Sequence, residues 1–259
     1  MKDKIISHSV GIGILIVCIL QFALYSQADS LSNELLAWGF RRGENHAQPV
    51  LDTKSKLVID DYDGIALGNS NSNKIYLTFD CGYEAGYTEK ILDVLEENDV
   101  KAAFFITAHY LNTANEIVKR MIEEGHIVGN HTVNHKTMPE LSNEDVQKEI
   151  MTLHGAVFEK FNYEMKYFRP PKGEFSERVI DIASNLGYKT VMWSSAYDDW
   201  DKAKQGREQY GKKKIIDNVH NGCVLLLHAT SEDNSKILGD VIREIKSMGY
   251  EFSSLDNFE

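Results

Sequence analysis

Cysteine is scarce in this chain of 259 residues, which contains only three. Cys18 lies in an apolar run, without the small residues that precede a lipoprotein cysteine. Cys81 closes one expected strand and Cys223 opens another, so we expect no bond between them. The cysteine count therefore excludes a disulfide framework, and the fold has to rest on a hydrophobic core.

Positive charge is also in short supply. The chain has 28 lysines and arginines against 39 aspartates and glutamates, for a formal net charge of −11. Such a chain cannot neutralise a phosphate backbone, so the balance excludes nucleic acid as a partner. It also argues against binding to a membrane surface through basic residues. A neutral or sugar-like substrate fits this charge better.

Proline is rare, with 4 residues, and we find no internal repeat and no low-complexity tract. With 42% hydrophobic and 26% charged residues, the composition is that of a globular protein. A chain of this length can bury one large core, so we expect one domain with appendages.

The one long apolar run lies at the N-terminus, over residues 10–25, after Lys2 and Lys4. The run is shorter than the roughly 20 residues of a membrane span, and small residues follow it. Residues 1–28 are therefore predicted to be a signal peptide or an uncleaved membrane anchor. A buried core helix is the alternative, which the lysines and the terminal position disfavour. We expect the protein to be exported, in the cell wall or anchored to the membrane.

Residues 29–70 are polar and weakly patterned, with scattered apolar residues around Trp38 and Phe40. We expect this segment to be an N-terminal extension that packs against the main domain, residues 71–259.

From residue 74 onward, short apolar strands alternate with amphipathic helices. We predict strands over residues 74–79, 102–106, 127–128, 167–168, 189–192 and 223–227, and helices over residues 88–98, 113–124, 142–161, 176–186, 213–219 and 235–248. Capping patterns at Thr113-x-x-Glu116 and Ser142-x-x-Asp145 open two of the helices. The alternation indicates an α/β fold with parallel strands, a distorted or incomplete (β/α) barrel of about seven strands.

Polar side chains cluster where these strands end. The clusters are Asp80-Cys81-Gly82, His131 to His135, Arg169 to Gly173, Tyr197 to Trp200, and His228. Because the carboxyl ends of barrel strands form the face that carries active sites, we expect the five clusters to share one site.

Two histidines four positions apart, His131 and His135, could ligate one metal ion from a helical turn. The preceding Gly129 and Asn130 would turn the backbone and bring the pair inward. Two histidines at this spacing are as often ordinary polar residues on the protein surface, so the pair by itself does not establish a metal site.

The other clusters also have ordinary structural explanations. Asp80 could cap a turn, Arg169 could form a surface ion pair, and Asp199 could be a capping residue beside the aromatic Trp200. His228 ends a leucine run and could be a satisfied core histidine. All of these explanations would have to hold together on one face, so a shared site is favoured.

In chain order the clusters resemble the five motifs of the NodB-type polysaccharide deacetylases, over roughly residues 71–255. The matching stretches are Thr78-Phe79-Asp80-Cys81-Gly82, His131-Thr132-Val133-Asn134-His135, Arg169-Pro170-Pro171-Lys172-Gly173, Asp199-Trp200 and Leu226-Leu227-His228. Within that family the chain is most similar, through residues 77–88 and 169–174, to the delta-lactam-biosynthetic de-N-acetylases of spore-forming bacteria. The resemblance implies the NodB-type fold and a hydrolase that removes acetyl from N-acetylmuramic acid, on the route to muramic delta-lactam in spore cortex.

The resemblance also implies a catalytic role for four residues. Asp80 matches the general base that takes a proton from water. Arg169 matches the residue that holds this carboxylate through charged hydrogen bonds. His228 matches the general acid for the leaving nitrogen, and Asp199 would orient and tune its imidazole.

His131 and His135 match the ligands of a divalent metal ion, with zinc as the first candidate. Most of the family completes this site with a second aspartate, which is Cys81 here. The delta-lactam subgroup also departs at this position, with an amide side chain. The Cys81 thiolate could ligate zinc, or Cys81 could be an inert residue beside a weak site that water completes.

Tyr83, Lys172, Trp200 and Leu226 are the expected substrate-binding residues, on the walls of the sugar groove. Peptidoglycan glycan strands are the predicted partner, and no protein partner is predicted. Two alternatives stay open: a deacetylase of N-acetylglucosamine in peptidoglycan or chitin-like oligomers, and an inactive glycan-binding homologue.

Overall fold

The computed structural model describes residues 31–259. The predicted signal peptide or anchor at residues 1–28 and Cys18 lie outside the described residues. Within residues 31–259, no helix is long and apolar enough to cross a membrane.

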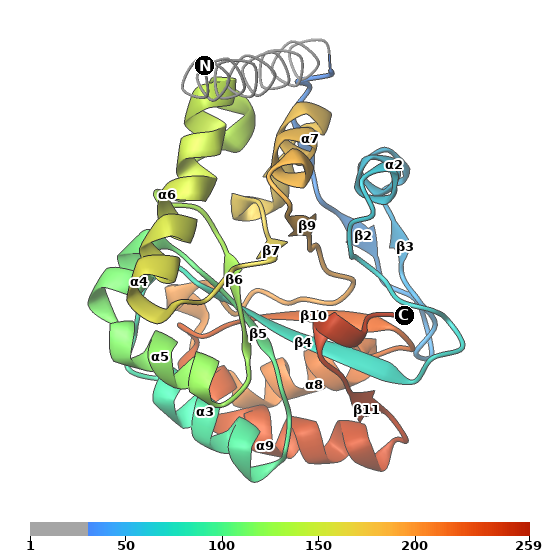
Figure 1. Ribbon diagram of the computed structural model, residues 1–259. Helices are drawn as coiled ribbons and strands as arrows, with labels where there is room; N and C mark the ends of the chain where they lie inside the picture. Colours follow the sequence, from blue (N-terminus) through green and yellow to red (C-terminus); the bar gives the residue numbers. More distant parts are fainter. Residues whose placement is uncertain (1–30) are drawn as a thin grey trace, which may run out of the picture.

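A sheet of seven parallel strands forms the centre of the molecule, in agreement with the predicted barrel (Figure 1). In spatial order its main path is β10 (Cys223–His228), β4 (Lys74–Cys81), β5 (Ala103–Ile106), β6 (Ile127–Asn130), β7 (Tyr167–Phe168) and β9 (Lys189–Thr190). The seventh strand, β11 (Glu251–Phe252), pairs with the start of β4. Beyond β9, Ser195 forms a single bridge to Leu225 of β10, so the two edges of the sheet meet in a short, irregular contact. This is a distorted barrel.

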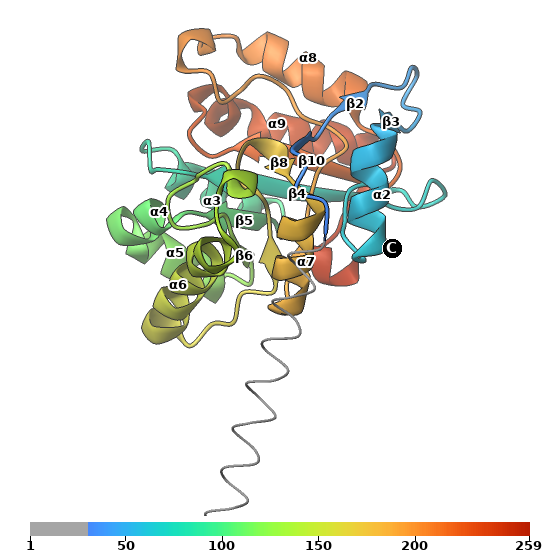
Figure 2. The ribbon, with the colours of Figure 1, turned by 90° about the horizontal axis from the view of Figure 1, so that it is seen from above.

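Helices connect the strands and lie around the outside of the sheet (Figures 1 and 2). They are α3 (Thr88–Glu97), α4 (Ala108–Thr113), α5 (Asn115–Glu123), α6 (Asn143–Phe161), α7 (Glu177–Asn185), α8 (Glu208–Asn218) and α9 (Glu232–Ser247), with short 3-10 turns η1 (Met138–Glu140), η2 (Pro171–Gly173), η3 (Lys202–Lys204) and η4 (Leu255–Asn257). All six predicted helices are present, although α8 begins earlier than predicted.

The two predicted helix caps have different outcomes. Ser142 caps α6, because its side chain accepts a hydrogen bond from the amide of Asp145. The predicted cap at Thr113 is wrong. Thr107 caps an additional helix, α4, and Thr113 is the last residue of that helix. After Ala114 the helix α5 begins without a side-chain cap.

The core has two parts because side chains alternate along each strand. On β4, Ile75, Leu77 and Phe79 face the surrounding helices and belong to the larger apolar cluster. Tyr76 on the same strand faces the barrel interior, in a smaller cluster with Phe105 and residues of neighbouring strands. The inner face of β4 therefore leads directly to Asp80 at the carboxyl end.

The N-terminal extension forms a third apolar cluster against α7 and the segment after β9. Its elements are β1 (Leu36–Ala37), β2 (Phe40–Arg41), β3 (Val50–Leu51) and α2 (Thr53–Asp61). β1 pairs antiparallel with β8 (Glu174–Phe175), the strand that follows the third motif. The domain boundary near residue 70 stays a prediction.

Candidate active site

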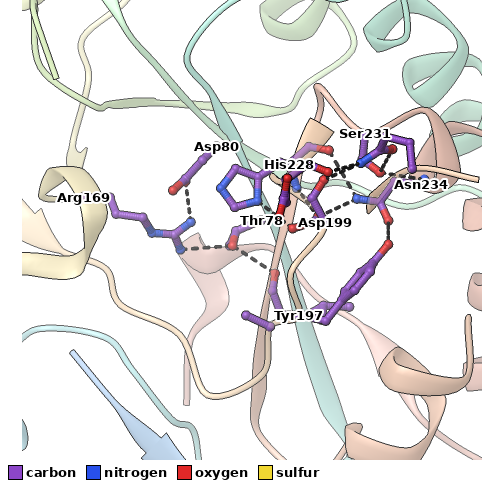
Figure 3. A network of polar contacts seen from close by, with 12 residues as sticks. Thr78, Asp80, Arg169, Tyr197, Asp199, His228, Ser231 and Asn234 are labelled. Carbon is purple, nitrogen blue, oxygen red and sulfur yellow. Dashed lines mark hydrogen bonds and ion pairs between the residues drawn. The ribbon is translucent and has the colours of Figure 1, made fainter. Parts of the chain in front are cut away.

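Asp80 and Arg169 form a buried ion pair inside the barrel (Figure 3). Nη1 of Arg169 lies 2.7 Å from Oδ1 of Asp80, and Nη2 donates to the hydroxyl of Thr78. The guanidinium lies 4.1 Å above the ring of Phe105, and Nε donates to the carbonyl of Val191. Each nitrogen of this fully buried guanidinium therefore has a hydrogen-bond partner, and one face of the group lies against an aromatic ring.

This environment keeps Asp80 ionised. Burial by itself would raise the pKa of Asp80, but the charges of Arg169 and His131 hold that pKa below its usual value. A carboxylate that accepts protons weakly in the resting site can still take one from an activated water that is held in place.

His131 and His135 do not lie on a helical turn, so that expectation is wrong. They occupy an irregular loop after β6, in which Thr132 and His135 have φ values of 70° and 54°. Gly129 and Asn130, which were expected to make the turn, belong to β6 itself. The left-handed residues of the loop redirect the chain instead.

The loop nevertheless brings the two imidazoles together, with ring centroids 4.8 Å apart. Nδ1 of His131 lies 2.8 Å from the carbonyl oxygen of Arg169, so Nδ1 carries the proton and Nε2 keeps its lone pair. That Nε2 lies 3.6 Å from Oδ2 of Asp80. Burial lowers the pKa of His131, and burial together with the charge of His131 lowers that of His135 to about 4.

Glu149 of α6 holds the histidine loop and was not singled out from the sequence. Its carboxylate accepts from the backbone and the side-chain amide of Asn134, both at 2.7 Å. Its backbone carbonyl accepts from the amide of Val133. The available signal was an acidic residue on the apolar face of an amphipathic helix, beside Val146 and Ile150.

His228 at the end of β10 pairs with Asp199 (Figure 3). Nδ1 of His228 lies 2.8 Å from Oδ1 of Asp199, and the amide of His228 donates to Oδ2. The side-chain amide of Asn234 donates to the same carboxylate, and the hydroxyl of Tyr197 donates to the side-chain oxygen Oδ1 of Asn234. Burial lowers the pKa of His228, but the charge and hydrogen bond of Asp199 outweigh it and raise the pKa above the usual value.

Asp80, His131, His135 and His228 meet at one cavity of about 520 Å³, large enough for a small ligand. The residues that line it are Asp80, Gly82, Tyr83, His131, His135, Lys172, Gly173, Trp193, Ala196, Tyr197, Trp200, Leu226, His228 and Thr230. The structure thus places the four predicted substrate-binding residues on its wall. Arg169 and Asp199 lie behind the wall, each bonded to a residue that faces the cavity. Trp193 and Thr230 are wall residues that the sequence patterns did not indicate.

Cys81 lies outside this cavity. Its side chain is fully buried in the apolar cluster on the helix side of β4, as the alternation after Asp80 requires. Burial raises the pKa of the Cys81 thiol well above its usual value, so it stays protonated. Cys81 and Cys223 are both free, as expected. Of the two alternatives for Cys81, the inert residue is the one that the structure supports.

The donor set fits a metal ion only in part. His131 and His135 are neutral imidazoles at one cavity, and the bond from Nδ1 of His131 to a carbonyl is the usual support of a ligating histidine. Within residues 31–259, however, no group of three or more histidine, cysteine or acidic side chains is arranged to hold a metal. Two imidazoles are thus the ligands that the described protein offers, and water would complete the coordination.

Comparison with known proteins agrees with this site. A family model for polysaccharide deacetylases matches residues 68–191. The peptidoglycan-N-acetylmuramic acid deacetylase PdaA of Bacillus subtilis is 40% identical over 233 residues, which cover 90% of this chain and 89% of that protein. A peptidoglycan-N-acetylglucosamine deacetylase of Bacillus cereus is 34% identical over 186 residues, or 71% of this chain and 86% of the relative.

A solved structure shows the same similarity at the level of the fold. The structure of B. subtilis PdaA, described as a family 4 carbohydrate esterase, superposes with a TM-score of 0.85 and 39% identity. The match covers 88% of this chain and 98% of that one. The chain therefore belongs to the polysaccharide deacetylase family, which confirms the predicted fold and enzyme class.

Proposed function

We propose that this protein removes the acetyl group from N-acetylmuramic acid residues of peptidoglycan strands. The observation that carries the proposal is a carboxylate and an imidazole at one cavity whose pKa values are shifted in opposite directions, that of Asp80 below and that of His228 above its usual value. Pairs of groups whose environments push their pKa values apart are typical of acid–base catalysis. The similarity to B. subtilis PdaA supports the same reaction.

The reaction uses these groups in turn. Asp80 takes a proton from water as the water oxygen adds to the acetyl carbonyl carbon. Arg169 keeps the base in place through its bond to Oδ1. When the carbon–nitrogen bond breaks, His228 gives its proton to the leaving nitrogen, so that acetate and a free amine result. Asp199 holds Nδ1 of His228, which leaves Nε2 as the nitrogen that faces the substrate.

His131 and His135 are the residues that would hold a divalent metal ion, and we propose zinc, bound weakly. A bound ion would polarise the acetyl carbonyl and lower the pKa of the attacking water. The neutral state of both imidazoles supports this role, since a protonated histidine cannot ligate. With two protein ligands in place of three, we expect an affinity below that of a complete site.

Lys172 favours a muramic substrate over a glucosamine one. N-acetylmuramic acid differs from N-acetylglucosamine by a lactyl ether, which carries a carboxylate at neutral pH. Lys172 lines the cavity and donates to Thr137, and no carboxylate of the described residues forms an ion pair with it. Its charge is therefore available to an anionic substrate group. The same proposal includes a role for the protein in spore-cortex synthesis and a location of the protein outside the cytoplasm.

Acetate release by purified full-length protein tests the proposal. Two substrates are compared, peptidoglycan strands stripped of their stem peptides and oligomers of N-acetylglucosamine, each with and without chelator. We expect release from the stripped strands, its loss with chelator, and its loss in Asp80→Asn, which should stay folded. Release from the glucosamine oligomers alone would overturn the substrate, and full turnover by Asp80→Asn would overturn the mechanism.

A further inference from the structure

The N-terminal extension touches the wall of the cavity on the side of the third motif. β1 pairs with β8, where Leu36 lies opposite Phe175, and the amide of Trp38 donates to the carbonyl of Gly173 at 2.8 Å. Gly173 and its neighbour Lys172 both line the cavity. The backbone of the extension therefore sets the position of this wall.

The same extension also touches the wall formed by the segment after β9. The indole Nε1 of Trp38 donates to the carbonyl of Trp193 at 2.8 Å, and Nη2 of Arg42 donates to the carbonyl of Ala196 at 3.0 Å. Trp193 and Ala196 line the cavity as well. Trp38 is thus bonded to two walls at once, one through its backbone and one through its side chain.

Trp38, Gly173 and Trp193 are packed closely against one another. Gly173 has a φ of 70°, and a Cβ on it would lie 2.8 Å from the ring of Trp193 and 3.2 Å from Cβ of Trp38. Such distances leave no space for an added methyl group, so only glycine fits this position. Close packing around Gly173 and the backbone bond from Trp38 therefore link Trp38 directly to the wall that carries Lys172.

Sequence similarity to known relatives bears on this segment independently of its contacts. The 233 residues shared with the B. subtilis relative named for N-acetylmuramic acid exceed the 189 positions of residues 71–259 by 44. At least part of the extension is therefore shared with that protein. The 186 residues shared with the B. cereus relative named for N-acetylglucosamine are 3 fewer than the 189 positions of residues 71–259, so the length of that match requires no part of the extension.

We propose that residues 31–51 of the extension form a specificity element, in which Trp38 is the positioning residue that fixes the two cavity walls for a muramic substrate. The inference rests on the proposed function, because it assigns the extension to that substrate. The lactyl ether of a muramic substrate can be bound in one orientation only if the cavity wall beside it has a fixed position. The hydrogen bonds and close packing of Trp38 fix that position. The walls would otherwise depend on the chain segments after β7 and β9 alone.

Two variants and a control test the inference in the full-length protein. Trp38→Phe keeps an aromatic ring and the backbone bond but removes the indole donor to Trp193. Leu51→Ala destabilises the same extension through its buried cluster, at a residue that pairs with Phe40 and does not itself line the cavity. The measurements are kcat and KM for stripped glycan strands and for N-acetylglucosamine oligomers, with the melting temperature of each variant.

We expect Trp38→Phe to raise KM for the stripped strands by roughly five- to tenfold, with kcat changed less than about twofold. The preference for stripped strands over glucosamine oligomers should fall by the same factor. Leu51→Ala should melt at a lower temperature and keep the wild-type preference. An unchanged KM and preference in Trp38→Phe, or an equal loss of preference in Leu51→Ala, would overturn the inference.

Failure of this inference can be distinguished from failure of the proposed function. If the wild-type protein releases no acetate from either glycan, the proposed function fails by itself. Calorimetric binding of the stripped strands to wild type and Trp38→Phe then decides the inference, with equal affinities counting against it.

Discussion

Asp80 and Cys81 are neighbours in the chain, but their side chains lie on opposite sides of β4. Asp80 faces the barrel interior and Arg169, whereas Cys81 is buried among apolar residues under the helices. The strand is regular through both positions, so the alternation of side chains decides their chemistry.

The pair of His228 and Asp199 leads to a prediction on pH. A general acid works only while protonated, so the rate should fall as the pH rises through the pKa of His228. In Asp199→Asn, burial acts without the opposing charge, and the pKa of His228 should drop below its usual 6.5. We expect the alkaline limb of kcat to move to lower pH and kcat at pH 8 to fall about 100-fold.

The pH dependence of kcat, measured from pH 5 to 9 for wild type and Asp199→Asn, checks this prediction. Ser235→Ala is the control, because Ser235 lies in the same helix start and donates to Glu232 rather than to the pair. An alkaline limb at the same pH in wild type and Asp199→Asn would contradict the assignment of His228 as the acid.

At the scale of elements, α6 is the support of the histidine loop. Ser142 starts this helix with a capped turn, and Glu149 lies two turns later, at the point where the loop passes. The side chain of Asn130 in β6 also donates to the carbonyl of Ile150 in α6. The position of the two imidazoles therefore depends on a helix that contributes no group to the cavity itself.

Glu149→Ala should loosen this loop and weaken metal binding. The variant removes both bonds to Asn134, and loss of such a supporting contact typically lowers metal affinity about 10- to 100-fold. Zinc affinity by competition with a chelating dye is the measurement. Glu159→Ala, at an exposed position on the same helix, is the matched control and should bind zinc as wild type does. Equal affinity in both variants would contradict the supporting role.

At the scale of the whole molecule, Arg169 joins strands from different parts of the barrel. It follows β7, bonds to Thr78 and Asp80 of β4, and donates to the carbonyls of Val191 and Met192 after β9. The cation is fully buried, so its loss would leave the carboxylate of Asp80 buried without a partner. The same group thus serves the reaction and the closure of the barrel.

Arg169→Met should therefore destabilise the protein, by about 3–5 kcal/mol at pH 7. Burial would then raise the pKa of Asp80, so the deficit should shrink as the pH falls and Asp80 becomes neutral. The double variant Arg169→Met with Asp80→Asn should recover much of the loss. Urea unfolding at pH 7 and pH 5 measures these differences, and a single variant as stable as the double one would refute the account.

Local sequence determined the order of strands and helices and the polar clusters at the strand ends. Apolar runs, the alternation of strands and helices, and the cap at Ser142 depend on residues close together in the chain. They can therefore be interpreted without knowledge of the rest of the fold. The motif residues could be located for the same reason, because parallel strands end at one face.

The tertiary structure alone decided how those residues are held. Thr113 ends a helix because Thr107 starts one earlier, and the histidine loop bends at Thr132 rather than in β6. The hydrogen bond from Trp38 to Trp193 joins positions 155 residues apart, and such a contact cannot be predicted from patterns among neighbouring residues. Packing of distant segments selects these arrangements, so the support of the site could be known only once the barrel was complete.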